Sequence, residues 1–190
     1  MILGKLLITT SMLGLVMPVS AAADDFTHEG SPIGHGKSVQ VSLTGPIGFN
    51  LALAPTFGVH CSQIHFSLKL EATGTGTVNG LQLTACTNTP QNLSVDMAMG
   101  GIPWKIHADA AGNRISITDI SVHNIVTLGG MVVGESWYTG DFTAAIDNSE
   151  ELGTVTLDDE GLVATIQGNQ FEADVSGDLS LQGATQIGVQ

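Results

Sequence analysis

Both cysteines of this chain lie in one stretch, from Cys61 to Cys86, in which apolar and polar residues alternate. The apolar residues of positions 64–70 are separated by single polar residues, so they would share one face of a β-strand. Asn79-Gly80 has the composition of a tight hairpin turn, and we expect it to join two strands whose outer ends carry the cysteines. The stretch predicts a hairpin closed by a disulfide, which for a loop of this size would stabilise the fold by about 3 to 4 kcal/mol.

The first 23 residues have the order of a secretory signal peptide. The positive charge of Lys5 is followed by an apolar run and by small residues that end at Ala23. We expect residues 1–23 to be a signal peptide, with cleavage after Ala23 or Ala21, and the protein to be secreted or periplasmic and of bacterial type. In such an oxidising compartment two cysteines favour a disulfide over a catalytic thiol. No other stretch is long and apolar enough to cross a bilayer, so we expect no transmembrane segment in the mature chain.

The charge of the chain is strongly acidic. Five Lys and Arg residues stand against 18 Asp and Glu residues, which gives a formal net charge of −13 with neutral histidines, and no Lys or Arg follows Arg114. A field of this sign repels nucleic acid and anionic lipid surfaces, and we expect neither as a partner. Solubility is the simplest role for the acidity, and attraction of divalent cations is the alternative.

Apolar residues recur at every second position in several further segments, including residues 38–44, 93–99, 115–117 and 171–175. Such alternation is typical of strands with one buried face, and no window beyond the first 23 residues has a helical period. We predict an all-β fold, an antiparallel β-sandwich or barrel of about ten to twelve short strands with one disulfide, and we slightly favour the sandwich. Residues 24–37 are polar without a period, so we expect a flexible N-terminal arm before a single β-domain of residues 38–190.

Several residues typical of turns divide this domain. Gly45-Pro46 predicts the end of a strand, Asp158-Asp159-Glu160-Gly161 a four-residue hairpin loop, and Gly168-Asn169 a two-residue turn. A change in the phase of the alternation at Asp119 predicts a β-bulge.

No metal or cofactor site is expected. Zinc sites usually have closely paired His or Cys ligands, and the strongest of the weak candidates is the pair His28 and His35 in the arm. The odd separation of His60 and His65 would place them on opposite faces of a strand. The acidic run 158–161 lacks the ligand spacing of a helix–loop calcium site.

No catalytic residues are predicted either, since the chain has no Gly-x-Ser-x-Gly elbow and no paired-carboxylate loop. We therefore expect no enzymatic activity. Trp104, Trp137 and Tyr138 are the candidate ligand contacts, because aromatic rings stack on sugars and pack against apolar ligands.

Three other classes of exported protein can be compared with this sequence. An outer-membrane barrel would carry aromatic girdles, which nine aromatic residues in the whole chain do not supply. A fimbria-like assembly subunit or adhesin would share the early disulfide, and its arm could donate a strand, but such subunits usually end with a tyrosine-bearing strand and the sole tyrosine here is Tyr138. The assembly subunit or adhesin stays an alternative function, and a periplasmic divalent-metal-binding protein is a further one.

The middle of the chain resembles the PraB-like exported bacterial proteins, which are described as activators of alkane oxidation. The shared pattern is Cys61 at a strand start, the alternating residues 64–68, a Gly/Thr-rich connection, Cys86, and Pro103-Trp104-Lys105-Ile106 about one strand later. It covers roughly residues 44–122. The resemblance implies an exported β-protein that assists growth on hydrophobic substrates at the cell surface. Our leading hypothesis is a non-enzymatic protein that binds hydrophobic small molecules or cell-surface components, or forms part of a surface or secreted layer.

Overall fold

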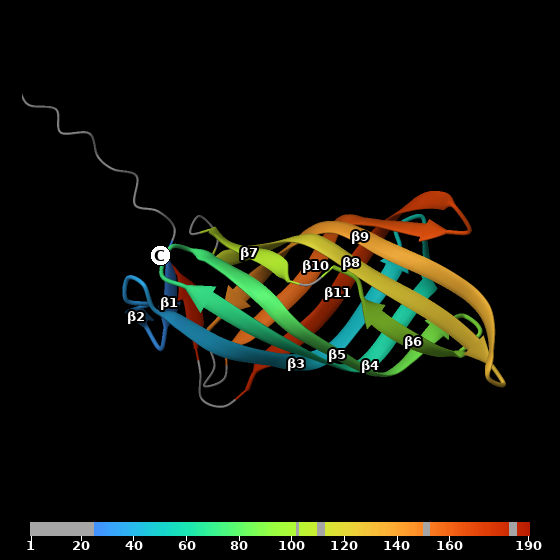
Figure 1. The fold of residues 1–190 in the computed structure, drawn as a ribbon, viewed down its shortest axis with the longest axis horizontal. Coiled ribbons are helices and arrows are strands. Elements are labelled where there is room, and N and C mark those ends of the chain that lie inside the picture. The colour runs from blue at the N-terminus through green and yellow to red at the C-terminus, as the bar shows by residue number, and fades with distance from the viewer. Residues whose placement is uncertain (1–24, 102, 110–112, 150–152, 183–185) are drawn as a thin grey trace, which may run out of the picture.

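The computed structural model describes residues 25–101, 103–109, 113–149, 153–182 and 186–190, which form β-strands and connections without a helix (Figure 1). The strands are β1 (Phe26–His28), β2 (Ser31–Pro32), β3 (Ser38–Leu51), β4 (Ala54–Glu71), β5 (Thr75–Thr89), β6 (Ser94–Met99), β7 (Trp104–Asp109), β8 (Arg114–Leu128), β9 (Met131–Asp147), β10 (Thr154–Ile166), β11 (Asn169–Leu181) and β12 (Ile187–Val189). Within these ranges no helix has the length and apolar character needed to cross a bilayer. The predicted signal peptide lies outside the described residues.

The large sheet closes on itself. Its strands follow the order β4-β3-β11-β10-β9-β8-β6-β5-β7, and the additional pairings β4–β5 and β8–β7 join its two ends. Every pairing is antiparallel. The nine strands occupy eight positions, because β6 and β7 succeed one another between β5 and β8. The all-β prediction is confirmed, and the preference for a sandwich was wrong: the pairing of β3 with β11 and of β4 with β5 leaves one continuous wall instead of two packed sheets.

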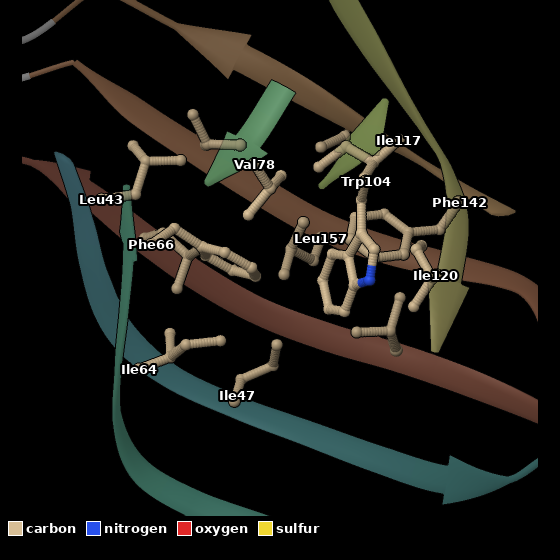
Figure 2. Packing of buried hydrophobic residues seen from close by; sticks show 14 of the residues in the cluster. Leu43, Ile47, Ile64, Phe66, Val78, Trp104, Ile117, Ile120, Phe142 and Leu157 are labelled. Atoms are coloured by element: carbon tan, nitrogen blue, oxygen red, sulfur yellow. The ribbon is translucent and has the colours of Figure 1, made fainter. Parts of the chain in front are cut away.

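The centre of the barrel is filled with apolar side chains. Alternating residues of each strand point inward, and Figure 2 shows side chains from several strands converging on Trp104. Trp104 is 1% exposed, and its ring lies edge-on to that of Phe66 with centroids 6.3 Å apart. Leu157 of β10 and Phe142 of β9 pack into the same cluster, so the middle of the barrel is a packed core and not a channel.

A small sheet covers one end of the barrel, which we call the capped end. It has the order β12-β1-β2, and Phe26 pairs with Val189. Figure 1 shows β1 and β2 at this end of the barrel. Phe26 and Ile187 are fully buried, which adds apolar contact to the short strands. The Asn113 side chain tethers this cap to the barrel, since its amide donates to the Ile146 carbonyl at 2.8 Å and its oxygen accepts from the Val189 N–H at 3.0 Å. In place of the expected flexible arm, part of residues 24–37 is therefore a strand with a buried anchor.

The disulfide prediction is confirmed, whereas the predicted turn of its hairpin was wrong. Cys61 and Cys86 form a disulfide between directly paired residues of β4 and β5. The hairpin turns at residues 72–74, where Gly74 has a φ of 66°. Asn79 lies inside β5 as the extra residue of a bulge, because Ser67 pairs with Gly80 and the next pair skips Asn79.

Two other predicted breaks are bulges within continuous strands. β3 runs through Gly45-Pro46 with a shift in register at that point. β10 likewise runs through residues 158–161, so the predicted four-residue hairpin was wrong. The bulge predicted at Asp119 is confirmed by a shift in register and a φ of 62°. The turn expected at Gly168-Asn169 occurs one residue earlier, at Gln167-Gly168, where both φ angles are positive.

Candidate functional site

The end of the barrel opposite the cap is open to solvent, and we call it the open end. The hairpin turns β3–β4, β8–β9 and β10–β11 and the β5–β6 connection lie there, because antiparallel neighbours alternate their turns between the two ends (Figure 1). At the tip of the β8–β9 hairpin, Gly129 and Gly130 both have positive φ and form the tight turn.

Large apolar side chains are exposed around this open end. Leu53 in the β3–β4 turn is 93% exposed, and Met131 at the β8–β9 tip is 69% exposed. We define the apolar rim as the exposed large apolar residues in or near these turns: Leu53, Phe57, Leu128, Met131, Val132, Val133 and Phe171. Exposed apolar residues are ordinary when scattered, but a group gathered at one end of a molecule marks a contact surface.

A pocket of about 190 Å³ opens within the rim. The strand ends of β3, β4, β5, β8, β9 and β10 surround it, so it is the mouth of the barrel. Its walls are mostly apolar, and the apolar side chains are those of Leu51, Phe57, Val59, Val126, Tyr138 and Ile166. Polar groups are contributed by β5 and its following connection, through Asn88, Thr89 and Gln91, and by Glu135 and Ser136 of β9.

The inner part of the pocket contains the sole tyrosine of the chain. Tyr138 is 2% exposed, and its ring is tilted against that of Phe49 with centroids 5.4 Å apart. Burial disfavours the charged phenolate and raises the pKa of Tyr138 to about 12. The phenol is therefore neutral at every physiological pH, and its hydroxyl is available only as a neutral donor or acceptor.

The wall beside the pocket is held by covalent and polar contacts. The Asn88 side chain accepts the Leu93 N–H at 2.7 Å and donates to the Gln91 side chain at 3.0 Å, which fixes the connection from β5 to β6. The Cys61–Cys86 disulfide joins β4 to β5 close to the pocket. The next inward-facing pair of these two strands toward the mouth is Val59 with Asn88. The mouth therefore has a preformed wall on the β4–β5 side.

The three aromatic residues predicted as ligand contacts lie in three different environments. Tyr138 lines the pocket. Trp104 is enclosed in the core, where its indole N–H donates to the Gly100 carbonyl at 3.3 Å. Trp137 is 41% exposed on the outer surface, stacked on His123 with ring centroids 4.1 Å apart. The structure therefore does not bring the three residues into one site.

The histidines do not form a cluster with other metal-ligating side chains. In the described part of the chain no group of three or more His, Cys, Asp or Glu residues could hold a metal ion. The expectation that His60 and His65 lie on opposite faces was wrong. The β3–β4 register skips residues at Ser62-Gln63, and both histidines alternate with buried neighbours, so both face outward.

Two features of this site escaped the sequence analysis. The β8–β9 tip, residues 128–133, is apolar on both sides of Gly129-Gly130, although hairpin tips are usually polar; this pattern is a signal for the apolar rim. The second is Asn124, which occupies an inward position in the alternating series Ile120, Val122, Asn124 and Val126. A polar residue at such a position of a strand is a signal for a buried polar group.

No protein-family model, curated protein sequence or solved structure matches this chain. The resemblance to the PraB-like proteins stays a prediction from the sequence.

Proposed function

We propose that this protein is an exported, non-enzymatic binding protein that takes up apolar small molecules in the pocket at the open end of its barrel. In this role it would assist the use of hydrophobic substrates such as alkanes. The observation that carries the proposal is the apolar pocket surrounded by the apolar rim. Small-molecule sites are typically concave and mostly apolar with a few polar groups, and barrel mouths are a common location for them.

The size of the pocket limits what it can enclose. An apolar cavity of about 150 Å³ is enough to hold benzene, so a pocket of about 190 Å³ accommodates a ring or a short alkyl segment. The packed core around Trp104 prevents deeper entry. A longer chain would therefore leave the pocket and lie over the apolar rim, where each Å² of apolar surface removed from water contributes about 25 cal/mol.

The apolar rim also favours a second candidate, an assembly subunit or adhesin that associates through this end. A rim contact between copies would bury the same side chains that a ligand tail would cover. Sedimentation of the purified protein separates the candidates, since a monomer at high concentration that still binds ligand supports the binding protein, and ligand-independent oligomers support assembly.

Tyr138 offers a direct test, because it is the only tyrosine of the chain and lines the pocket. With ring-labelled tyrosine, a titration with n-hexane followed by NMR should give a saturable shift of a single Tyr138 ring signal. No shift at saturating hexane would reject the proposal.

A filled pocket gives the matched variant. A Cβ atom at Gly134 would be in ordinary contact with Val126, at 3.9 Å from its Cβ, and would point into the mouth. We expect Gly134→Val to fold, to fill the pocket and to abolish the hexane-dependent shift. Gly80→Val is the control, because Gly80 lies in β5 outside this pocket. A Cβ atom at Gly80 would lie 3.4 Å from the Cβ of Ser67, which is ordinary van der Waals contact. Unchanged binding by Gly134→Val would place the ligand elsewhere.

A further inference from the structure

One polar side chain is buried directly beside the pocket without a full set of partners. Asn124 of β8 is 0% exposed. No other polar or charged residue whose side chain the structure describes is buried. Its amide nitrogen donates to the Ser136 hydroxyl at 3.3 Å, and its Oδ1 has no hydrogen-bond partner. If the amide is turned around, the nitrogen becomes the group without a partner, so either orientation leaves one polar atom unsatisfied.

Buried polar atoms are nearly always paired in folded proteins, and one that is not calls for an explanation, such as a water, an ion or a ligand that supplies the partner. With an apolar residue of similar volume at this position, the protein would fold without leaving a buried polar atom unpaired. The neighbouring inward positions of β8 are apolar, as Val122 and Val126 show. The fold itself therefore gives no reason for an amide at position 124.

The position of Asn124 connects this unsatisfied atom to the pocket. Asn124 pairs with Ser136 across the β8–β9 ladder and precedes Val126 on the same inward face. Ser136, Val126 and Tyr138 all line the pocket. Asn124 itself is enclosed and does not line the pocket, so its amide lies behind the inner wall, in contact with Ser136. A small movement of the Ser136 or Asn124 side chain would bring the amide to the pocket, whose outer end is bordered by the apolar rim.

We infer that the ligand is a neutral amphiphile with a hydroxyl head, a medium-chain or long-chain primary alcohol, bound with its hydroxyl toward Asn124 and its alkyl tail across the apolar rim. A hydroxyl both donates and accepts, so it satisfies the amide in either orientation. This inference rests on the proposed function, because it names the ligand class of the same pocket.

The charges at the pocket favour a neutral head over a carboxylate. Its lining residues, all in the described part of the chain, include the carboxylate of Glu135 and no Lys, Arg or His. The formal net charge of the chain is −13. A fatty-acid anion would be desolvated at the inner end without a compensating cation, which is unfavourable.

The test compares 1-hexanol, n-hexane and hexanoate in the same Tyr138 titration, with the wild-type protein and with Asn124→Leu. We expect wild type to bind 1-hexanol about tenfold more tightly than hexane, as one additional hydrogen bond allows, and to bind hexanoate most weakly. Asn124→Leu should bind 1-hexanol and hexane equally. Circular dichroism and cooperative thermal unfolding of Asn124→Leu verify that the variant is folded.

The outcomes separate this inference from the proposed function. Equal binding of hexane and 1-hexanol by wild type overturns the inference and leaves the apolar pocket intact, whereas binding of neither overturns the proposed function. Tighter binding of hexanoate overturns the neutral head. A preference for 1-hexanol that persists in Asn124→Leu overturns the role of Asn124.

A measurement on the wild-type protein applies even if Asn124→Leu does not fold. In the 1-hexanol complex, nuclear Overhauser effects should connect the ligand CH₂OH protons with the Asn124 side-chain amide protons. The terminal methyl group should contact the ring of Phe57, which lines the pocket and belongs to the apolar rim. The reverse pattern, with the methyl group at Asn124, would contradict the inference.

Discussion

Reduction of the Cys61–Cys86 disulfide is expected to destabilise the barrel by about 3.5 kcal/mol. The two cysteines are 25 residues apart in sequence. In the chain-entropy model, releasing a loop of that length returns about 12 cal/mol/K to the unfolded chain, which is about 3.5 kcal/mol at 25 °C. With a slope of about 1 to 3 kcal/mol per molar urea for a small protein, the unfolding midpoint should fall by about 1.2 to 3.5 M.

The assay is equilibrium unfolding in urea, with and without reductant, followed by the fluorescence of the buried Trp104 and by circular dichroism. The double variant Cys61→Ala/Cys86→Ala is the control and should not respond to reductant. Reduced wild type retains both buried sulfur atoms. The difference between its unfolding midpoint and that of the double variant therefore measures the packing that is lost with the sulfur atoms. A midpoint that stays within about 0.3 M after complete reduction, verified by thiol titration, would refute the chain-entropy argument.

Three further predictions concern the cap, the pocket and the barrel wall. Phe26→Ala should lower the free energy of unfolding by about 3 to 5 kcal/mol, because it leaves a cavity in the cap. Phe171 is partly exposed, so Phe171→Ala should change the free energy of unfolding by only about 0.5 kcal/mol. Thermal unfolding of both variants measures the difference, and similar losses would contradict the role of the cap. Because burial raises the pKa of Tyr138 from its usual value of 10.0 to about 12, the contribution of Tyr138 to stability should be complete below about pH 10 and be lost as the pH rises toward 12. An ultraviolet titration should give that pKa, and Tyr138→Phe should remove this part of the alkaline destabilisation. Ionisation near pH 10 would show that the ring is not buried. Gly45→Ala should be strongly destabilising, since its Cβ would overlap a backbone carbonyl of β11, whereas Gly80→Ala should be tolerated; urea midpoints compare the two, and equal midpoints would argue against the close approach of β3 and β11.

The strands were largely predictable, and the errors came from bulges. Period-2 alternation indicated the buried faces of β4, β8 and β11 because each has one face on the core. Asn79-Gly80 and the acidic run 158–161 consist of residues that serve equally in turns and bulges. A bulge needs a partner strand to be recognised, and the sequence does not show which strands pair. The predicted strands were therefore cut too short at these places.

The closure of the barrel and the pocket depended on long-range pairing that local patterns do not contain. Whether β3 and β11 pair decides between a sandwich and a barrel, and these strands are far apart in sequence. Tyr138 was predicted as a ligand contact together with Trp137, but adjacent residues of a strand face opposite sides, so only one of them reaches the pocket. Asn124 and the apolar rim can be recognised as parts of one site only after the strand pairing has located the mouth of the barrel.

The pairing of Phe26 with Val189 joins strands from the two ends of the described chain. Such a contact cannot form while the last residues are still within the ribosome, and the β3–β11 seam is similarly late. High contact order of this kind slows folding. In the exported protein that we propose, slow closure of the barrel would be an advantage, because the polypeptide would stay unfolded and competent for translocation for longer.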